Sequence, residues 1–150
     1  MRPFPAPEPR EGLKMNFLDS NDLKELVRFA SDTDEQTSGG RITLTLRDVL
    51  QIAGEGRIAP DSGEEDLART IKRPARKAAG DPAGYWELAQ GVYWVTYNES
   101  VRIPDDSALI LQPHEGIMVN GLWHPTLVVR DWDEMKGVLL TVGARGVKLL

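Results

Sequence analysis

Residues 86–111 read WELAQGVYWVTYNESVRIPDDSALIL, a stretch rich in aromatic and β-branched side chains and interrupted at Asn98-Glu99 and Pro104-Asp105-Asp106. Such side chains favour extended chain, whereas the interrupting residues favour turns. The same pattern continues downstream in three short apolar runs, Thr126–Val129, Val138–Val142 and Val147–Leu150. Many short strands separated by turns are typical of a β-sandwich, jelly roll or distorted barrel. We therefore predict that residues 85–150 form an antiparallel β body.

The segment before this body, residues 19–84, carries mainly helical signals. Asp19 or Ser20 can cap a helix with an apolar face of period three to four, made of Leu23, Leu26, Val27 and Ala30. The polar residues from Ser31 to Gly40 then indicate a loop.

Two further helices are predicted in the same segment. One runs from Thr45 to Gly54, since Thr45 and Asp48 have the spacing of a capping box. The other begins at Ser62 and ends before Pro74. The predicted fold class is thus α+β, with short N-terminal helices followed by an antiparallel β-rich body.

Composition sets the remaining bounds. The chain of 150 residues has the length of one domain, and prolines at 3, 5, 7 and 9 favour a flexible extended arm over residues 1–18. The absence of cysteine excludes disulfides and thiolate metal sites. A net charge of −5 argues against general nucleic-acid binding. No apolar run suggests a membrane span or a signal peptide, so we expect a cytoplasmic protein.

Several stretches together resemble the dUTPase and dCTP deaminase superfamily, in particular its archaeal dUTPase-like branch. They are WELAQGVYWVTYNESVRIPDDSALILQPHEGIMVNGL, HPTLVVRDWDEMKGVLLTV and RGVKLL, preceded by ITLTLRDVLQIAGEGRIAP. The likeness runs from about Arg41 to Leu150. It implies a β-rich subunit with a distorted jelly roll, or β-clip, that forms homotrimers with active sites at subunit interfaces.

The loop after Pro113 is where the family's triphosphate-binding residues are expected. In the family this loop reads Arg-Ser-Ser, followed by an apolar pair and a second Arg, because guanidinium and hydroxyl groups satisfy a charged anion. Here the matching residues are His114, Glu115 and Gly116, and Val119 stands for the second arginine. The resemblance therefore implies a degenerate phosphate-binding motif. We take four residues of this loop as candidate substrate-binding residues: His114, Glu115, Gly116 and Asn120.

A turn further along the chain matches the family's second site motif. The family has a hairpin with an aspartate associated with the attacking water and, in dUTPases, a tyrosine that packs on the deoxyribose. Asp131 is the matching aspartate, with Asp133 as its rival. Met135 stands near the expected tyrosine and is a further candidate substrate-binding residue. Either aspartate could act as a general base, and either could instead form the turn through its side chain.

Other chemistry is less well supported by the sequence. Deamination is less well supported because Thr141 occupies, or lies next to, the position where a related deaminase would have a glutamate. The two histidines do not make a zinc site. His124, between Trp123 and Pro125, is expected to be packed or interfacial.

Three functions remain open from the sequence. The first is a dUTPase-like protein that binds a deoxynucleotide weakly, or serves regulation or assembly, with a degenerate catalytic site. The second is an active Mg²⁺-dependent enzyme that converts dUTP to dUMP and pyrophosphate through rearranged phosphate contacts. The third is an interaction module without a nucleotide, whose basic segment Arg69–Lys77 contacts a partner. Mg²⁺ is expected only together with a nucleoside triphosphate.

Overall fold

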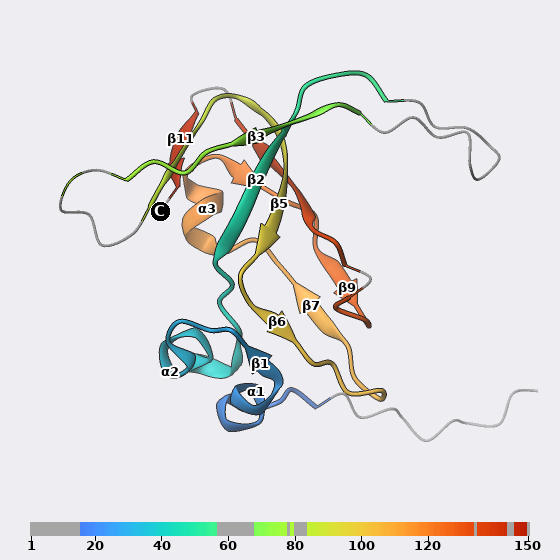
Figure 1. Cartoon of the computed structure of the whole chain (residues 1–150). Coiled ribbons are helices and arrows are strands. Elements are labelled where there is room, and N and C mark those ends of the chain that lie inside the picture. The colour runs from blue at the N-terminus through green and yellow to red at the C-terminus, as the bar shows by residue number, and fades with distance from the viewer. Residues whose placement is uncertain are drawn as a thin grey trace, which may run out of the picture.

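The computed structural model describes residues 16–56, 68–77, 79, 84–133, 135–143 and 146–149. Residues 1–15 of the predicted arm lie outside this range, and residues 16–18 belong to no helix or strand. The fold is mostly antiparallel β with a few short helices. In Figure 1 the two N-terminal helices lie at one end of the β body.

The largest sheet has five strands in the order β3-β2-β5-β10-β8, and every pair in it is antiparallel. Its strands are β2 (Leu46–Ile52), β3 (Thr70–Arg73), β5 (Gly91–Tyr97), β8 (Leu122–Trp123) and β10 (Val138–Val142). Three two-stranded sheets complete the described part of the β body. They pair β1 (Val27–Arg28) with β6 (Ser100–Val101), β4 (Trp86–Leu88) with β11 (Val147–Leu149), and β7 (Leu109–Leu111) with β9 (Leu127–Val129).

The hydrophobic core lies on one face of the large sheet. Along β10, Val138, Leu140 and Val142 are buried while Leu139 and Thr141 are exposed, as the period of two in a strand requires. The neighbouring strands add buried side chains to the same cluster: Val49, Leu88, Tyr93, Val95, Leu111 and Leu122. The alternation confirms the strand predicted at Val138–Val142.

The first predicted helix is confirmed in part as α1 (Ser20–Leu26), with Asp19 as its N-cap, whereas Val27 and Ala30 of the predicted apolar face lie beyond the helix. The side chain of Asp19 accepts hydrogen bonds from the backbone N–H groups of Asn21 and Asp22. The helix ends at Leu26 because Val27 enters β1 and pairs with Val101. The predicted loop Ser31–Gly40 is wrong in part, since it contains α2 (Thr33–Gln36) and the 3₁₀ helix η1 (Ser38–Gly40).

The predicted helix Thr45–Gly54 is wrong, because Leu46–Ile52 form β2. This strand lies between β3 and β5 and hydrogen-bonds to both, which outweighs the weak local preference for a helix. A register shift between Leu46 and Asp48 breaks the period of two, so the apolar spacing imitated a helix.

The third predicted helix is also wrong where it can be compared. Residues 62–67 lie outside the described range, and Thr70–Arg73 form the exposed strand β3. Residues 19–84 are therefore not mainly helical in their described part.

A buried carboxylate joins the N-terminal helices to the β body. Glu99 is only 3% exposed, and its side chain accepts hydrogen bonds from Gln36 Nε2 at 2.7 Å, the Thr45 backbone N–H at 2.8 Å and Thr45 Oγ1 at 2.6 Å. Gln36 also donates to the Thr43 carbonyl oxygen. The network fixes the chain entering β2 against the turn between β5 and β6.

Candidate functional site

The residues predicted to form one site lie in two places of the chain. His114, Glu115, Gly116 and Asn120 belong to the short helix α3 (Glu115–Val119) and its two caps. Asp131, Asp133 and Met135 belong to the turn between β9 and β10. His114 and Glu115 line one hollow, whereas the residues of the turn line two others, so the described chain does not bring the two groups together.

The start of α3 is closed by its own side chains. His114 is the N-cap, and its Nδ1 accepts a hydrogen bond from the backbone N–H of Gly116 at 3.0 Å. An accepting Nδ1 carries no proton, so the ring is neutral in this arrangement. Glu115 adds an acid in the first turn, and Asn120 donates to the Gly116 carbonyl oxygen at 2.8 Å. The Gly116 N–H and the Asn120 side-chain amide are therefore both hydrogen-bonded within this loop.

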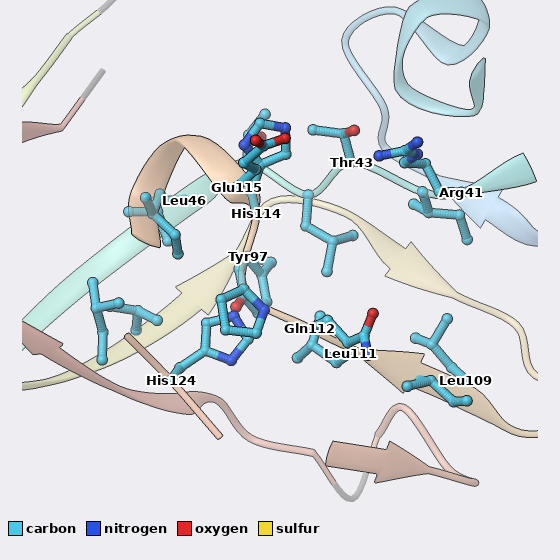
Figure 2. Close-up of a pocket in the computed structure, with 18 of the residues that line it drawn as sticks. Arg41, Thr43, Leu46, Tyr97, Leu109, Leu111, Gln112, His114, Glu115 and His124 are labelled. Carbon is cyan, nitrogen blue, oxygen red and sulfur yellow. The ribbon is translucent and has the colours of Figure 1, made fainter. Parts of the chain in front are cut away.

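His114 and Glu115 also line a cavity of about 530 Å³. Figure 2 shows them with Thr43 on one side of this cavity, and His124 and Leu111 on the other. The lining is largely apolar, and burial raises the pKa of the Tyr97 hydroxyl in its wall to about 12.

His124 is buried, with 4% of its surface exposed, which confirms the packed position expected for it. Its Nδ1 lies 2.9 Å from the carbonyl oxygen of Pro125. A carbonyl oxygen can only accept, so Nδ1 is the donor in this contact.

Asp131 and Asp133 lie in an exposed turn, and the side chain of Asp131 stabilises it. Asp131 Oδ1 accepts a hydrogen bond from the backbone N–H of Asp133 at 2.9 Å. The turn-forming role considered for Asp131 is therefore present. Between them, Trp132 packs at an angle against Tyr97, with ring centroids 6.4 Å apart.

Two hollows flank this turn and share Ser100, Trp132 and Asp133 as lining residues. The smaller, of about 280 Å³, also contains Met135, Phe29 and two cations, Arg47 and Lys136. The larger, of about 430 Å³, contains Asp131 and three arginines, Arg28, Arg102 and Arg130. Sequence reasoning missed these three arginines, because only the strand pairing brings their distant positions together.

The basic segment Arg69–Lys77 is largely engaged within the chain. Lys72 Nζ lies 2.6 Å from Asp48 Oδ1, and the hydrogen bond from this lysine lowers the pKa of the Asp48 carboxyl. Arg76 pairs with Glu87, and Arg73 donates to Gln51 Oε1. These contacts weaken the case for a partner-binding patch on this segment.

The described ranges show neither a metal-binding cluster nor a membrane-spanning helix. They contain no group of three or more histidine, aspartate or glutamate side chains that could hold a metal ion. No helix among these residues is both long and apolar enough to cross a membrane.

Comparison with known proteins gives the family. No family model and no solved structure matches the chain. The chain is 28% identical to the "Probable deoxyuridine 5′-triphosphate nucleotidohydrolase" of Methanosarcina mazei over 147 residues, covering 90% of this chain and 81% of that protein. It is 30% identical to proteins of the same description from Methanosarcina acetivorans and Methanococcoides burtonii, covering 79% of this chain and 69% of each. These likenesses, over more than two thirds of each relative, show that the chain belongs to the deoxyuridine 5′-triphosphate nucleotidohydrolase (dUTPase) family.

Proposed function

We propose that the protein binds a deoxyuridine nucleotide beside the Asp131 turn and hydrolyses it slowly or not at all. Membership of the dUTPase family supports the ligand class. The observation that carries the loss of activity is the closed start of α3, where His114 caps the Gly116 N–H that an anion would otherwise meet. The family's phosphate-binding motif is, in this proposal, degenerate.

The negative charge of Glu115 also disfavours phosphate binding at the start of α3. Glu115 stands where the family has a serine, and a carboxylate 4 Å from a phosphate charge costs about 1 kcal/mol in water. At an effective dielectric constant of 20 the cost rises to about 4 kcal/mol. Because His114 is neutral while it caps α3, it does not offset this repulsion.

A second candidate is a working dUTP hydrolase with rearranged phosphate contacts, and one observation favours it. Asp131 uses one carboxylate oxygen in the turn and lines a hollow that contains three arginines. Its carboxylate would take a proton from the attacking water as the water oxygen bonds to the α-phosphorus. The bond from this phosphorus to the bridging oxygen breaks, and dUMP and pyrophosphate are released. Asp133 is the alternative base.

Mg²⁺ fits the residues of this turn only in company with a nucleotide. Asp131 and Asp133 offer the carboxylate oxygens that Mg²⁺ prefers, yet no metal-binding group of three such residues exists in the described ranges. The ion would therefore be held by one or both carboxylates and by phosphate oxygens. When bound, it neutralises charge on the transferred phosphate.

A homotrimer is part of the same proposal, because a neighbouring subunit could bring a second α3 to the Asp131 turn. Exposed apolar side chains on α3 and on nearby strands support subunit contacts, namely Met118, Val119, Trp123 and Val128. Sedimentation equilibrium tests this directly: a mass three times that of the chain supports it, and a monomer contradicts it.

Turnover and binding need separate measurements. We expect purified protein with Mg²⁺ to release pyrophosphate from dUTP at least a hundredfold more slowly than the roughly 10 s⁻¹ typical of enzymes. Calorimetry with a non-hydrolysable dUTP analogue should still give a heat of binding, larger than that with the dCTP analogue. Turnover at ordinary rates that is lost in Asp131→Asn would establish the second candidate instead. If no deoxynucleotide binds, the remaining hypothesis is an interaction module that does not use a nucleotide.

A further inference from the structure

We propose that Arg28, Arg102 and Arg130 form a polyphosphate-binding site that takes over the contacts missing at α3. This inference rests on the proposed nucleotide function and names the residues that hold the phosphates. All three arginines line the hollow of about 430 Å³ beside the Asp131 turn.

Strand register places two of these arginines on one face. In the β1–β6 pair, Val27 is opposite Val101 and both are buried, whereas Arg28 is opposite Ser100. The backbone N–H of Arg102 donates to the Leu26 carbonyl oxygen at 2.8 Å, which continues the pairing by one residue. Because successive residues of a strand point to opposite faces, Arg28 and Arg102 project away from the buried valines as diagonal neighbours.

The third arginine arrives from a different part of the chain. Arg130 directly follows β9 and directly precedes the Asp131 turn. All three side chains are exposed, and within the part of the chain that the structure describes none forms an ion pair with a carboxylate. Two other arginines differ in this respect, since Arg47 pairs with Asp48 and Arg76 with Glu87. Three guanidinium groups around one hollow match the several oxygens of a polyphosphate.

The charge of the hollow indicates which form of polyphosphate fits. Asp105, Asp131 and Asp133 line it as well, so the arginines and aspartates balance in formal charge. A bare polyanion would meet both attraction and repulsion there. A polyphosphate that carries Mg²⁺ presents oxygens to the arginines and a cation to the carboxylates, and we infer that it is the preferred form.

The residue after Arg28 extends the same site toward the smaller hollow. Phe29 has a φ of 64°, the only positive φ of a non-glycine residue in the described ranges, and its side chain is 78% exposed. A bulky residue in this conformation is strained, and strain of this kind clusters at ligand-binding sites. Phe29 lines the hollow that also contains Asp133 and Met135. With phosphates on the arginines, its ring is available to pack on the sugar or base.

The test compares arginine variants by calorimetry, with inorganic triphosphate and the non-hydrolysable dUTP analogue as probes, each with and without Mg²⁺. The variants Arg28→Ala and Arg130→Ala should each weaken triphosphate binding about ten- to a hundredfold, as expected for losing a charge-assisted hydrogen bond. Two control variants should bind within twofold of wild type. Arg41→Ala removes a cation beside His114 and Glu115, and Arg76→Ala removes one held by Glu87. Circular dichroism checks that every variant is folded.

The outcomes separate this inference from the proposed function. If the dUTP analogue binds wild type and the Arg28 and Arg130 variants equally well, the arginine site is wrong while the nucleotide function stands. If Arg41→Ala abolishes triphosphate binding, the phosphates lie at α3 and the inference is overturned. If triphosphate binds through the arginines but no deoxynucleotide analogue binds more tightly, the proposed function fails and the anion site remains. Wild type that binds neither probe contradicts both.

Discussion

Replacing Glu99 by alanine should destabilise the fold more than replacing any exposed acidic residue by alanine. The carboxylate is 3% exposed and accepts three hydrogen bonds, from Gln36 Nε2 and from two donors of Thr45. A hydrogen bond to a charged group contributes about 1.5–3 kcal/mol, and the deletion also leaves buried donors without an acceptor. We expect a loss of about 3–5 kcal/mol, a large share of the roughly 5–15 kcal/mol that holds a domain folded.

The assay is chemical and thermal unfolding followed by circular dichroism. At about 2–4 °C per kcal/mol for a chain of this size, the melting temperature should fall by about 6–20 °C. Glu99→Gln keeps the shape but turns one acceptor into a donor that faces other donors, so it should lose about half as much. Glu25→Ala, on the exposed side of α1, is the control and should change stability by less than about 0.5 kcal/mol. A Glu99→Ala protein within about 1 kcal/mol of wild type would refute the reasoning.

Three further predictions concern single residues. Gly137→Ala should lower the free energy of unfolding in urea by about 2–4 kcal/mol, because φ is 152° and a Cβ would lie against Trp94 and 2.7 Å from the Val95 carbonyl oxygen. Gly121→Ala, where a Cβ would have nothing within 4 Å, should lower it clearly less. Since burial raises the pKa of Tyr97 to about 12, the contribution of the neutral Tyr97 hydroxyl to stability is complete below pH 10 and is lost as the pH rises toward 12. In Tyr97→Phe, tyrosinate absorbance should lack the part that titrates near pH 12, and the melting temperature should fall less between pH 10 and pH 12 than in wild type. Phe29→Asn should raise stability by up to about 1 kcal/mol because asparagine tolerates a positive φ, and should weaken binding of the dUTP analogue; unchanged stability would mean that the strain is small.

The strands of the β body were predictable because their side chains carry the signal locally. Val138–Val142 alternates between buried and exposed positions, and β10 has the bounds expected from the sequence. Leu46–Ile52 was mistaken for a helix because its strand character comes from β3 and β5 on either side, which are distant in the sequence. The finer jelly-roll topology, the single domain and the trimer stay predictions.

Site residues that are neighbours in the sequence could be predicted, whereas those brought together only by the fold could not. Asp131 and Asp133 stand out as a turn between two apolar runs, and the structure places them in such a turn. Arg28, Arg102 and Arg130 have no common pattern in the sequence, and they line one hollow only through the pairing of β1 with β6 and the position of β9. The capping role of His114 also depended on a helix that sequence reasoning treated as a loop.

The order of the large sheet has a consequence for solubility at high concentration. A sheet edge offers unpaired backbone groups to which another chain can add, and proteins protect such edges with charge or short length. At one end of this sheet, the four residues of β3 are exposed and include Lys72 and Arg73, whose charges would have to be desolvated by an added strand. At the other end, β8 has only two residues. Both edges therefore resist growth into aggregates, and replacing the β3 cations with valine should shorten the lag time of fibril formation.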